Sequence, residues 1–202
     1  MKITTKILSV LISICLIFRI IQLILKLFYI IVINLSIKNG VETVRRYFNF
    51  MLSEISIDNI LSYILFWSLL IVLSSWLYLM YRTAQNNTSR IFSFKPIWAL
   101  FALLIPIFNL IGPYKILSEL WVVNNKNLEI ENYGQKQILK WCILSIGLFI
   151  FSRILNHIAL NGTTIVDLLK YEYYCLVFLA ISIHYLLLTK KLVGLFKQAN
   201  YS

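Results

Sequence analysis

The sequence has few of the residues from which enzymes and disulfide-rich domains usually build their sites. Its 202 residues include three cysteines, two histidines and eight carboxylates. Cys15, Cys142 and Cys175 lie far apart in apolar stretches with no CxxC pair, so neither a disulfide framework nor a zinc site is indicated. Gly-rich phosphate loops, nucleophile elbows, HExxH and aspartate clusters are also missing. We therefore predict no catalytic residues, no metal and no cofactor.

Apolar residues, in contrast, are abundant. They make up 60% of the chain, and the mean hydropathy is +0.81, which is more apolar surface than one soluble core of this length can bury. The formal net charge is +11, but the cations lie mostly at the edges of apolar runs, where they orient a membrane protein and contact anionic lipid head groups. We therefore predict an all-α integral membrane helical bundle whose partner is the lipid bilayer, and no nucleic acid.

The apolar runs predict a single transmembrane domain over residues 1–202. Full spans are expected at about 7–34, 60–82, 138–160 and 173–189, and interfacial segments at about 38–57 and 114–125. The segment at 96–112 has only seventeen residues, which is about 25 Å of helix and barely crosses the hydrocarbon layer. Pro106 and Pro113 also lack the backbone N–H groups that a helix would use there. We predict four full spans plus a Pro-broken re-entrant or half-depth segment, with five spans as the close alternative.

The distribution of charge favours the first arrangement. If residues 96–112 cross the bilayer, six of the flanking cations lie on the side of the N-terminus and ten on the opposite side. If this segment enters and returns on the same side, twelve lie on the side of the N-terminus and four on the opposite side. The twelve are Lys2, Lys6, Arg82, Arg90, Lys95, Lys115, Lys126, Lys136, Lys140, Lys190, Lys191 and Lys197. The positive-inside rule then predicts that these residues and the N-terminus are cytoplasmic.

A polar core is predicted around the broken segment, because backbone oxygens freed by proline at membrane depth need polar partners. We expect Arg82 to pair with Glu119, supported by amides. The predicted polar-core or ligand-binding residues are Arg82, Asn86, Asn109, Glu119, Pro106 and Pro113. This core either pins the broken segment or binds a small ligand, a lipid or a partner protein.

A second polar feature lies in the first span. Polar residues recur there at helical spacing and form one stripe, interrupted at Leu16. The stripe is either a polar edge that faces the bundle or lies at the membrane interface, which we favour, or it lines a pore or contacts an anion. The pore-lining candidates are Ser9, Ser13, Arg19, Gln22 and Lys26.

The central stretch also contains a pattern made of Tyr81-Arg82, Asn86, Pro96, Trp98, Ala99, Pro106-Ile107, Asn109-Leu110, Pro113-Tyr114, Glu119 and Trp121. With these residues it resembles a known family, the bacterial multi-pass membrane proteins grouped as domain-of-unknown-function family 4328. The chain departs from the family pattern in placing Trp76 a turn early and in reading Phe94-Lys95 where a serine usually precedes the proline. The resemblance implies a bacterial inner-membrane location and a shared polar core, but no reaction.

Three functions follow as hypotheses. The first is a non-enzymatic inner-membrane module whose polar core binds a small ligand, a lipid or a partner protein. The second is an oligomeric pore-forming or membrane-disrupting effector lined by the first helix, as a homo-oligomer. The third, which we rank last, is a lipid-acting enzyme that would need Arg153, His157, Glu172 and His184 to converge.

Overall fold

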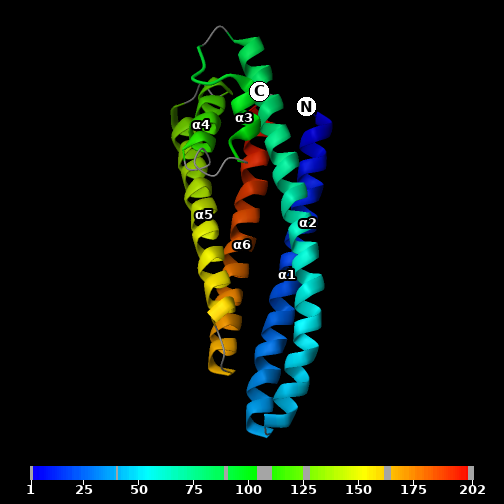
Figure 1. Cartoon of the computed structure of the whole chain (residues 1–202). Coiled ribbons are helices and arrows are strands. Elements are labelled where there is room, and N and C mark those ends of the chain that lie inside the picture. Colours follow the sequence, from blue (N-terminus) through cyan, green and yellow to red (C-terminus); the bar gives the residue numbers. More distant parts are fainter. Residues whose placement is uncertain are drawn as a thin grey trace. The chain divides into compact units, whose positions relative to one another are not determined.

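The computed structural model describes residues 2–39, 41–88, 91–103, 111–124, 128–161 and 165–199. Its helices are α1 (Lys2–Asn39), α2 (Val41–Asn87), α3 (Pro96–Phe101), α4 (Gly112–Asn124), α5 (Leu128–Asn161) and α6 (Ile165–Ala199) (Figure 1). Within these residues there is no strand. The predicted all-α class is confirmed.

Four helices of the described chain are long and apolar enough to cross a membrane. The candidate spans are Ile3–Leu35, Ile60–Asn87, Asn132–Ile158 and Leu169–Lys197. Helix α3, with six residues, is about 9 Å long and cannot cross alone. The chain is therefore a membrane protein built as a helical bundle, as predicted. The bend predicted at Pro106 lies outside the described residues.

Two prolines begin helices. Pro96 is in the first turn of α3, where the amide of Trp98 donates to the carbonyl of Lys95 at 3.0 Å. Pro113 is in the first turn of α4 and is buried. A proline in a first turn costs no helical hydrogen bond, because the amide there has no partner within the helix. Pro113 thus separates the central segment from α4 by starting the latter.

Helix α2 is continuous over 47 residues. Much of the predicted interfacial segment at 38–57 and the whole predicted span at 60–82 belong to this one helix. Neither proline nor glycine occurs between Val41 and Asn87, so nothing in the backbone interrupts it.

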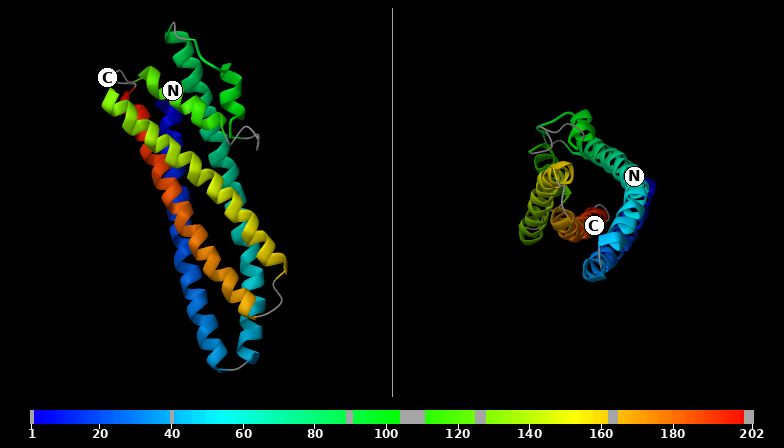
Figure 2. Two further views of the ribbon diagram at one scale, coloured as in Figure 1. Left: turned by 90° about the vertical axis from the view of Figure 1, so that its left-hand side faces the viewer. Right: turned by 60° about the horizontal axis from the view of Figure 1, so that its bottom comes forward.

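The chain folds as two compact units, and its long helices run from one into the other. Unit 1 comprises Met1–Ile14, Trp67–Ile146 and Tyr185–Ser202, and unit 2 comprises Cys15–Phe66 and Gly147–His184. In unit 1, α3, α4, the first turns of α1 and the last turns of α6 lie at the same end (Figures 1 and 2).

The core of unit 1 is aromatic. The ring of Phe196 lies between the indoles of Trp76 and Trp121, with centroid distances of 5.8 and 5.3 Å and edge-to-face geometry. All three side chains are at most 3% exposed. Since they come from α2, α4 and α6, this contact ties three helices together. Trp76 also donates to the hydroxyl of Thr5 on α1 at 3.3 Å.

Unit 2 contains α1 from Cys15 onward, α2 up to Phe66, α5 from Gly147 onward and α6 up to His184. Phe151 of α5 stacks on Phe178 of α6 at 6.1 Å and meets the ring of Tyr174 edge-on at 6.4 Å. Leu155 and Leu179 are buried beside them on the same two helices. Rings therefore join α5 to α6 in unit 2.

Two serine hydroxyls inside the spans bond to their own helices. Ser75 donates to the carbonyl of Ile71 at 2.8 Å, and Ser182 donates to that of Phe178 at 2.8 Å. A hydroxyl that bonds four residues back needs no water. Such residues are therefore compatible with lipid.

Candidate functional site

The carboxylate of Glu119 joins three segments of unit 1. Its Oε2 accepts a hydrogen bond from the hydroxyl of Tyr81 at 2.5 Å, and its Oε1 accepts one from the amide of Ser93 at 3.2 Å. The Tyr81 oxygen in turn accepts from the amide of Phe94 at 3.2 Å. We call Tyr81, Ser93, Phe94 and Glu119 the Glu119 clasp. It fastens the chain before α3 to α2 and α4.

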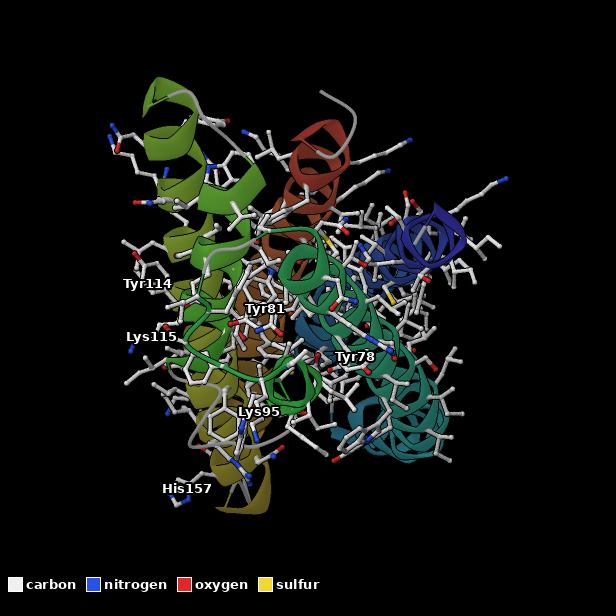
Figure 3. The ribbon with its side chains drawn as sticks, turned by 90° about the horizontal axis from the view of Figure 1, so that it is seen from above. Tyr78, Tyr81, Lys95, Tyr114, Lys115 and His157 are labelled. Atoms are coloured by element: carbon white, nitrogen blue, oxygen red, sulfur yellow. The ribbon has the colours of Figure 1, made fainter. Side chains whose placement is uncertain are left out.

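The clasp replaces the predicted pair of Arg82 with Glu119. Tyr81 is 0% exposed and lies among the helices of unit 1 (Figure 3), whereas Arg82 is exposed and donates to the hydroxyl of Tyr78 at 3.4 Å. Successive residues of a helix point about 100° apart, so Tyr81 and Arg82 cannot both face α4. The partner of the Glu119 carboxylate is therefore Tyr81, one residue before the predicted Arg82.

The other predicted core residues are dispersed. Asn86 is exposed on α2, and Pro113 is buried at the start of α4. Pro106 and Asn109 lie outside the described residues. Among the described members of the set, only Glu119 lies in this hydrogen-bonded cluster, and a ligand-binding role for the set stays a prediction.

A buried ion pair lies in unit 2. The ammonium of Lys26 on α1 is 2.9 Å from Oε1 and 2.8 Å from Oε2 of Glu172 on α6. The Glu172 side chain is 0% exposed and that of Lys26 is 14% exposed. The ammonium also lies 5.7 Å from the ring centre of Tyr29 and 5.9 Å from that of Tyr171. Oε2 has no hydrogen bond besides this ion contact.

The rest of the predicted stripe also has partners within the chain. In unit 2, Arg19 donates to Gln22 at 2.8 Å, and Gln22 donates to Ser62 of α2 at 3.1 Å. In unit 1, Ser13 donates to the carbonyl of Ser9 at 3.0 Å and accepts from Lys190 of α6 at 3.3 Å. These contacts favour the bundle-facing interpretation of the stripe over a pore lining.

The sequence analysis names Glu172 only for the enzyme hypothesis and does not predict its ion pair with Lys26. Helix α6 begins at Ile165, so Glu172 is already two turns inside it. A signal was present, because Lys26 in an apolar helix requires a buried anion, and Glu172 is the carboxylate nearest the predicted span at 173–189.

The groups proposed for an enzyme do not form a cluster of this kind. Arg153 is exposed and lies 5.3 Å from the ring centre of Phe149, and His157 and His184 are exposed, whereas Glu172 is buried with Lys26. Within the described residues, no three of His, Cys, Asp and Glu could hold a metal ion.

The family model described as Domain of unknown function (DUF4328) matches residues 56–198, more than half of the chain. The chain belongs to this family. Neither a curated protein nor a solved structure matches it. The DUF4328 match begins inside α2, so α1 with Lys26 lies outside the matched part, while Glu172 lies within it.

Several residues of the DUF4328 resemblance have packing roles. Tyr81 and Ala99 are 0% exposed, and Trp121 is 1% exposed. A Cβ added at Gly134 of α5 would overlap the indole of Trp121, so glycine at this position lets α5 approach α4. Trp98 differs, because it is 43% exposed.

The positive charge of this DUF4328 chain is concentrated in unit 1. By sequence, unit 1 holds twelve Lys and Arg against three Glu, and unit 2 holds seven Lys and Arg against five carboxylates. Unit 1 therefore carries +9 of the net charge of +11. Its twelve cations are the same twelve that the re-entrant arrangement places on one side of the membrane. All of them with described side chains are exposed: Lys6, Arg82, Lys95, Lys115, Lys136, Lys140, Lys190, Lys191 and Lys197.

Proposed function

We propose that this protein is a non-enzymatic module of the bacterial inner membrane whose basic end binds anionic lipid head groups. The basic end is the set of exposed Lys and Arg of unit 1 named above. The observation that carries the proposal is the +9 charge of unit 1. A lysine near an anionic membrane surface contributes about 1 kcal/mol of attraction, so several together give a strong preference for anionic lipid.

The same charge supports a cytoplasmic position for this end. Cytoplasmic flanks of membrane helices carry an excess of Lys and Arg. Both ends of the chain belong to unit 1, so the proposal places the N-terminus and the C-terminus in the cytoplasm. Reporters that are active on only one side of the membrane, fused separately to each terminus, test this orientation.

The Glu119 clasp has a structural role in this proposal. Both carboxylate oxygens accept hydrogen bonds from within the chain, one from Tyr81 and one from Ser93. The clasp holds the segment that carries Lys95, which is exposed. Glu119 therefore helps to present a cation at the basic end.

Lipid composition tests the proposal. The full-length protein is extracted with its surrounding lipid by an amphipathic copolymer, and the ratio of anionic to zwitterionic phospholipid is compared with that of the bulk membrane. We expect enrichment of anionic lipid, which decreases when the protein is re-equilibrated with lipid at high salt, because salt screens exposed charges. A ratio equal to that of the bulk membrane would overturn the proposal.

A further inference from the structure

In unit 1, α5 and α6 form an exposed face that combines lysines with an aromatic ring. The ammonium of Lys191 on α6 lies 5.3 Å from the ring centre of Tyr133 on α5. Lys136 and Lys140 follow Tyr133 by three and seven residues, so all three lie on one face of α5. Lys136, Lys140 and Lys191 are exposed. Lys191 thus contacts the aromatic ring, and two further exposed lysines lie on the same face of α5.

The packing beneath this face fixes the two helices against each other. The indole of Trp141 on α5 donates to the hydroxyl of Thr189 on α6 at 2.8 Å, and its ring stacks on that of Tyr185 at 5.4 Å. Trp141 and Thr189 are both at most 2% exposed. The lysines therefore extend from a rigid base.

Apolar residues continue the same face farther into the spans. On α5, Ile143 is 59% exposed and lies three residues beyond Lys140, and on α6, one turn before Lys191, Leu187 is 51% exposed. A surface that is cationic at the helix end and apolar deeper in the helix matches the head group and acyl chains of an anionic lipid.

We infer that Lys136, Lys140 and Lys191, with Tyr133, form a specific site for a lipid whose head group carries two phosphates. This inference rests on the proposed function, and it names the lipid class and the residues. Three ammonium groups exceed the charge of a single phosphodiester, so a head group with two phosphates neutralises more of the site. The cation–π contact with Tyr133 holds Lys191 in place for this ligand.

The test measures lipid binding to the full-length protein in detergent by native mass spectrometry. The probes are cardiolipin with two phosphates, phosphatidylglycerol with one, and zwitterionic phosphatidylethanolamine. The site variant is Lys136→Gln/Lys140→Gln/Lys191→Gln. We expect the wild-type protein to bind cardiolipin most tightly. The variant should bind it on the order of a hundredfold more weakly, since each lysine contributes roughly fivefold.

The matched control removes three other exposed lysines of unit 1, as Lys6→Gln/Lys95→Gln/Lys115→Gln. It has the same net charge as the site variant and should keep the preference for cardiolipin over phosphatidylglycerol. Equal losses in the two variants would overturn the specific site and leave the proposed function standing. A wild-type protein that binds all three lipids equally would overturn both.

Two further measurements keep the result interpretable. The variant Lys136→Arg/Lys140→Arg/Lys191→Arg keeps the charges and should retain cardiolipin binding, so loss of binding there as well would refute a charge-based site. Inorganic pyrophosphate is added as a competitor without acyl chains. Displacement of cardiolipin by an equal concentration of pyrophosphate would show a site for a soluble diphosphate and overturn the lipid assignment. Melting temperatures equal to that of the wild-type protein verify that each variant folds.

Discussion

Replacing Lys26 with Met removes the ammonium from the buried ion pair and nearly keeps the side-chain length. We expect the free energy of unfolding to fall by about 3 to 5 kcal/mol. The Glu172 side chain is 0% exposed, and the Lys26 ammonium lies 2.8 Å from its Oε2. With an effective dielectric constant of about 20, opposite charges at that distance attract by about 6 kcal/mol. Desolvation costs several kcal/mol for each ion, so the net contribution of the pair to the free energy of unfolding is close to zero. An unpaired buried carboxylate keeps the desolvation penalty and has no attraction to offset it.

A double-mutant cycle separates the charge effect from packing. The variants are Lys26→Met, Glu172→Met and the double variant Lys26→Met/Glu172→Met. Because the double variant has no buried charge, its stability should lie within about 1 kcal/mol of the wild-type value or above it. The coupling energy between the two positions is then about 3 kcal/mol or more. Titration with sodium dodecyl sulfate in mixed micelles, followed by tryptophan fluorescence, measures all four stabilities.

The ion pair of Lys170 with Asp167 provides the matched control. These residues are also in unit 2, but their charged groups are 3.8 Å apart and their side chains are 62% and 32% exposed. Lys170→Met should change stability by less than about 0.5 kcal/mol. If Lys26→Met costs no more than this control, or if the double variant is as unstable as Lys26→Met, the reasoning about an unpaired buried carboxylate is refuted.

Three further substitutions test the packing and hydrogen bonds of unit 1. Gly134→Ala should destabilise the protein by about 1 to 3 kcal/mol, because the added methyl group overlaps the indole of Trp121. A methyl group added at Gly147 meets nothing within 4 Å, so Gly147→Ala should be neutral or slightly stabilising in the same unfolding titration. Glu119→Gln leaves one of two donors without an acceptor, so the free energy of unfolding should fall by about 1 to 3 kcal/mol. The amides before α3 should also exchange their hydrogens faster, and unchanged exchange would contradict the clasp. Trp141→Phe removes a buried donor bonded at 2.8 Å to a threonine of α6, with an expected cost of about 1 to 2 kcal/mol in thermal unfolding.

The membrane helices could be predicted because hydropathy and length directly reflect the thickness of the bilayer. The predicted spans at 7–34 and 60–82 fall inside candidate spans of the structure. Helix ends could not be predicted from hydropathy, since a helix continues into polar sequence wherever its backbone remains bonded. The start of α6 at Ile165 and the length of α2 both show this.

Side-chain partners were harder to predict than helices. Glu119 could be identified because a carboxylate beside an apolar segment needs donors, but its partner depended on the rotation of α2, which decides between Tyr81 and Arg82. Lys26 and Glu172 are 146 residues apart, so their contact required the packing of α1 against α6. The close approach of Gly134 to Trp121 could not be predicted either, because no repeating pattern in the sequence indicates it.

Helix α2 has a consequence for how this protein can be approached experimentally. Its 47 residues extend about 70 Å, more than twice the hydrocarbon thickness of about 30 Å. By sequence, the turns before Ile60 carry several charged residues that need surroundings other than lipid chains, namely Glu42, Arg45, Arg46, Glu54 and Asp58. An epitope or a cross-linker placed between Val41 and Asn59 would therefore report on neighbours outside the hydrocarbon layer and leave the candidate span Ile60–Asn87 unchanged.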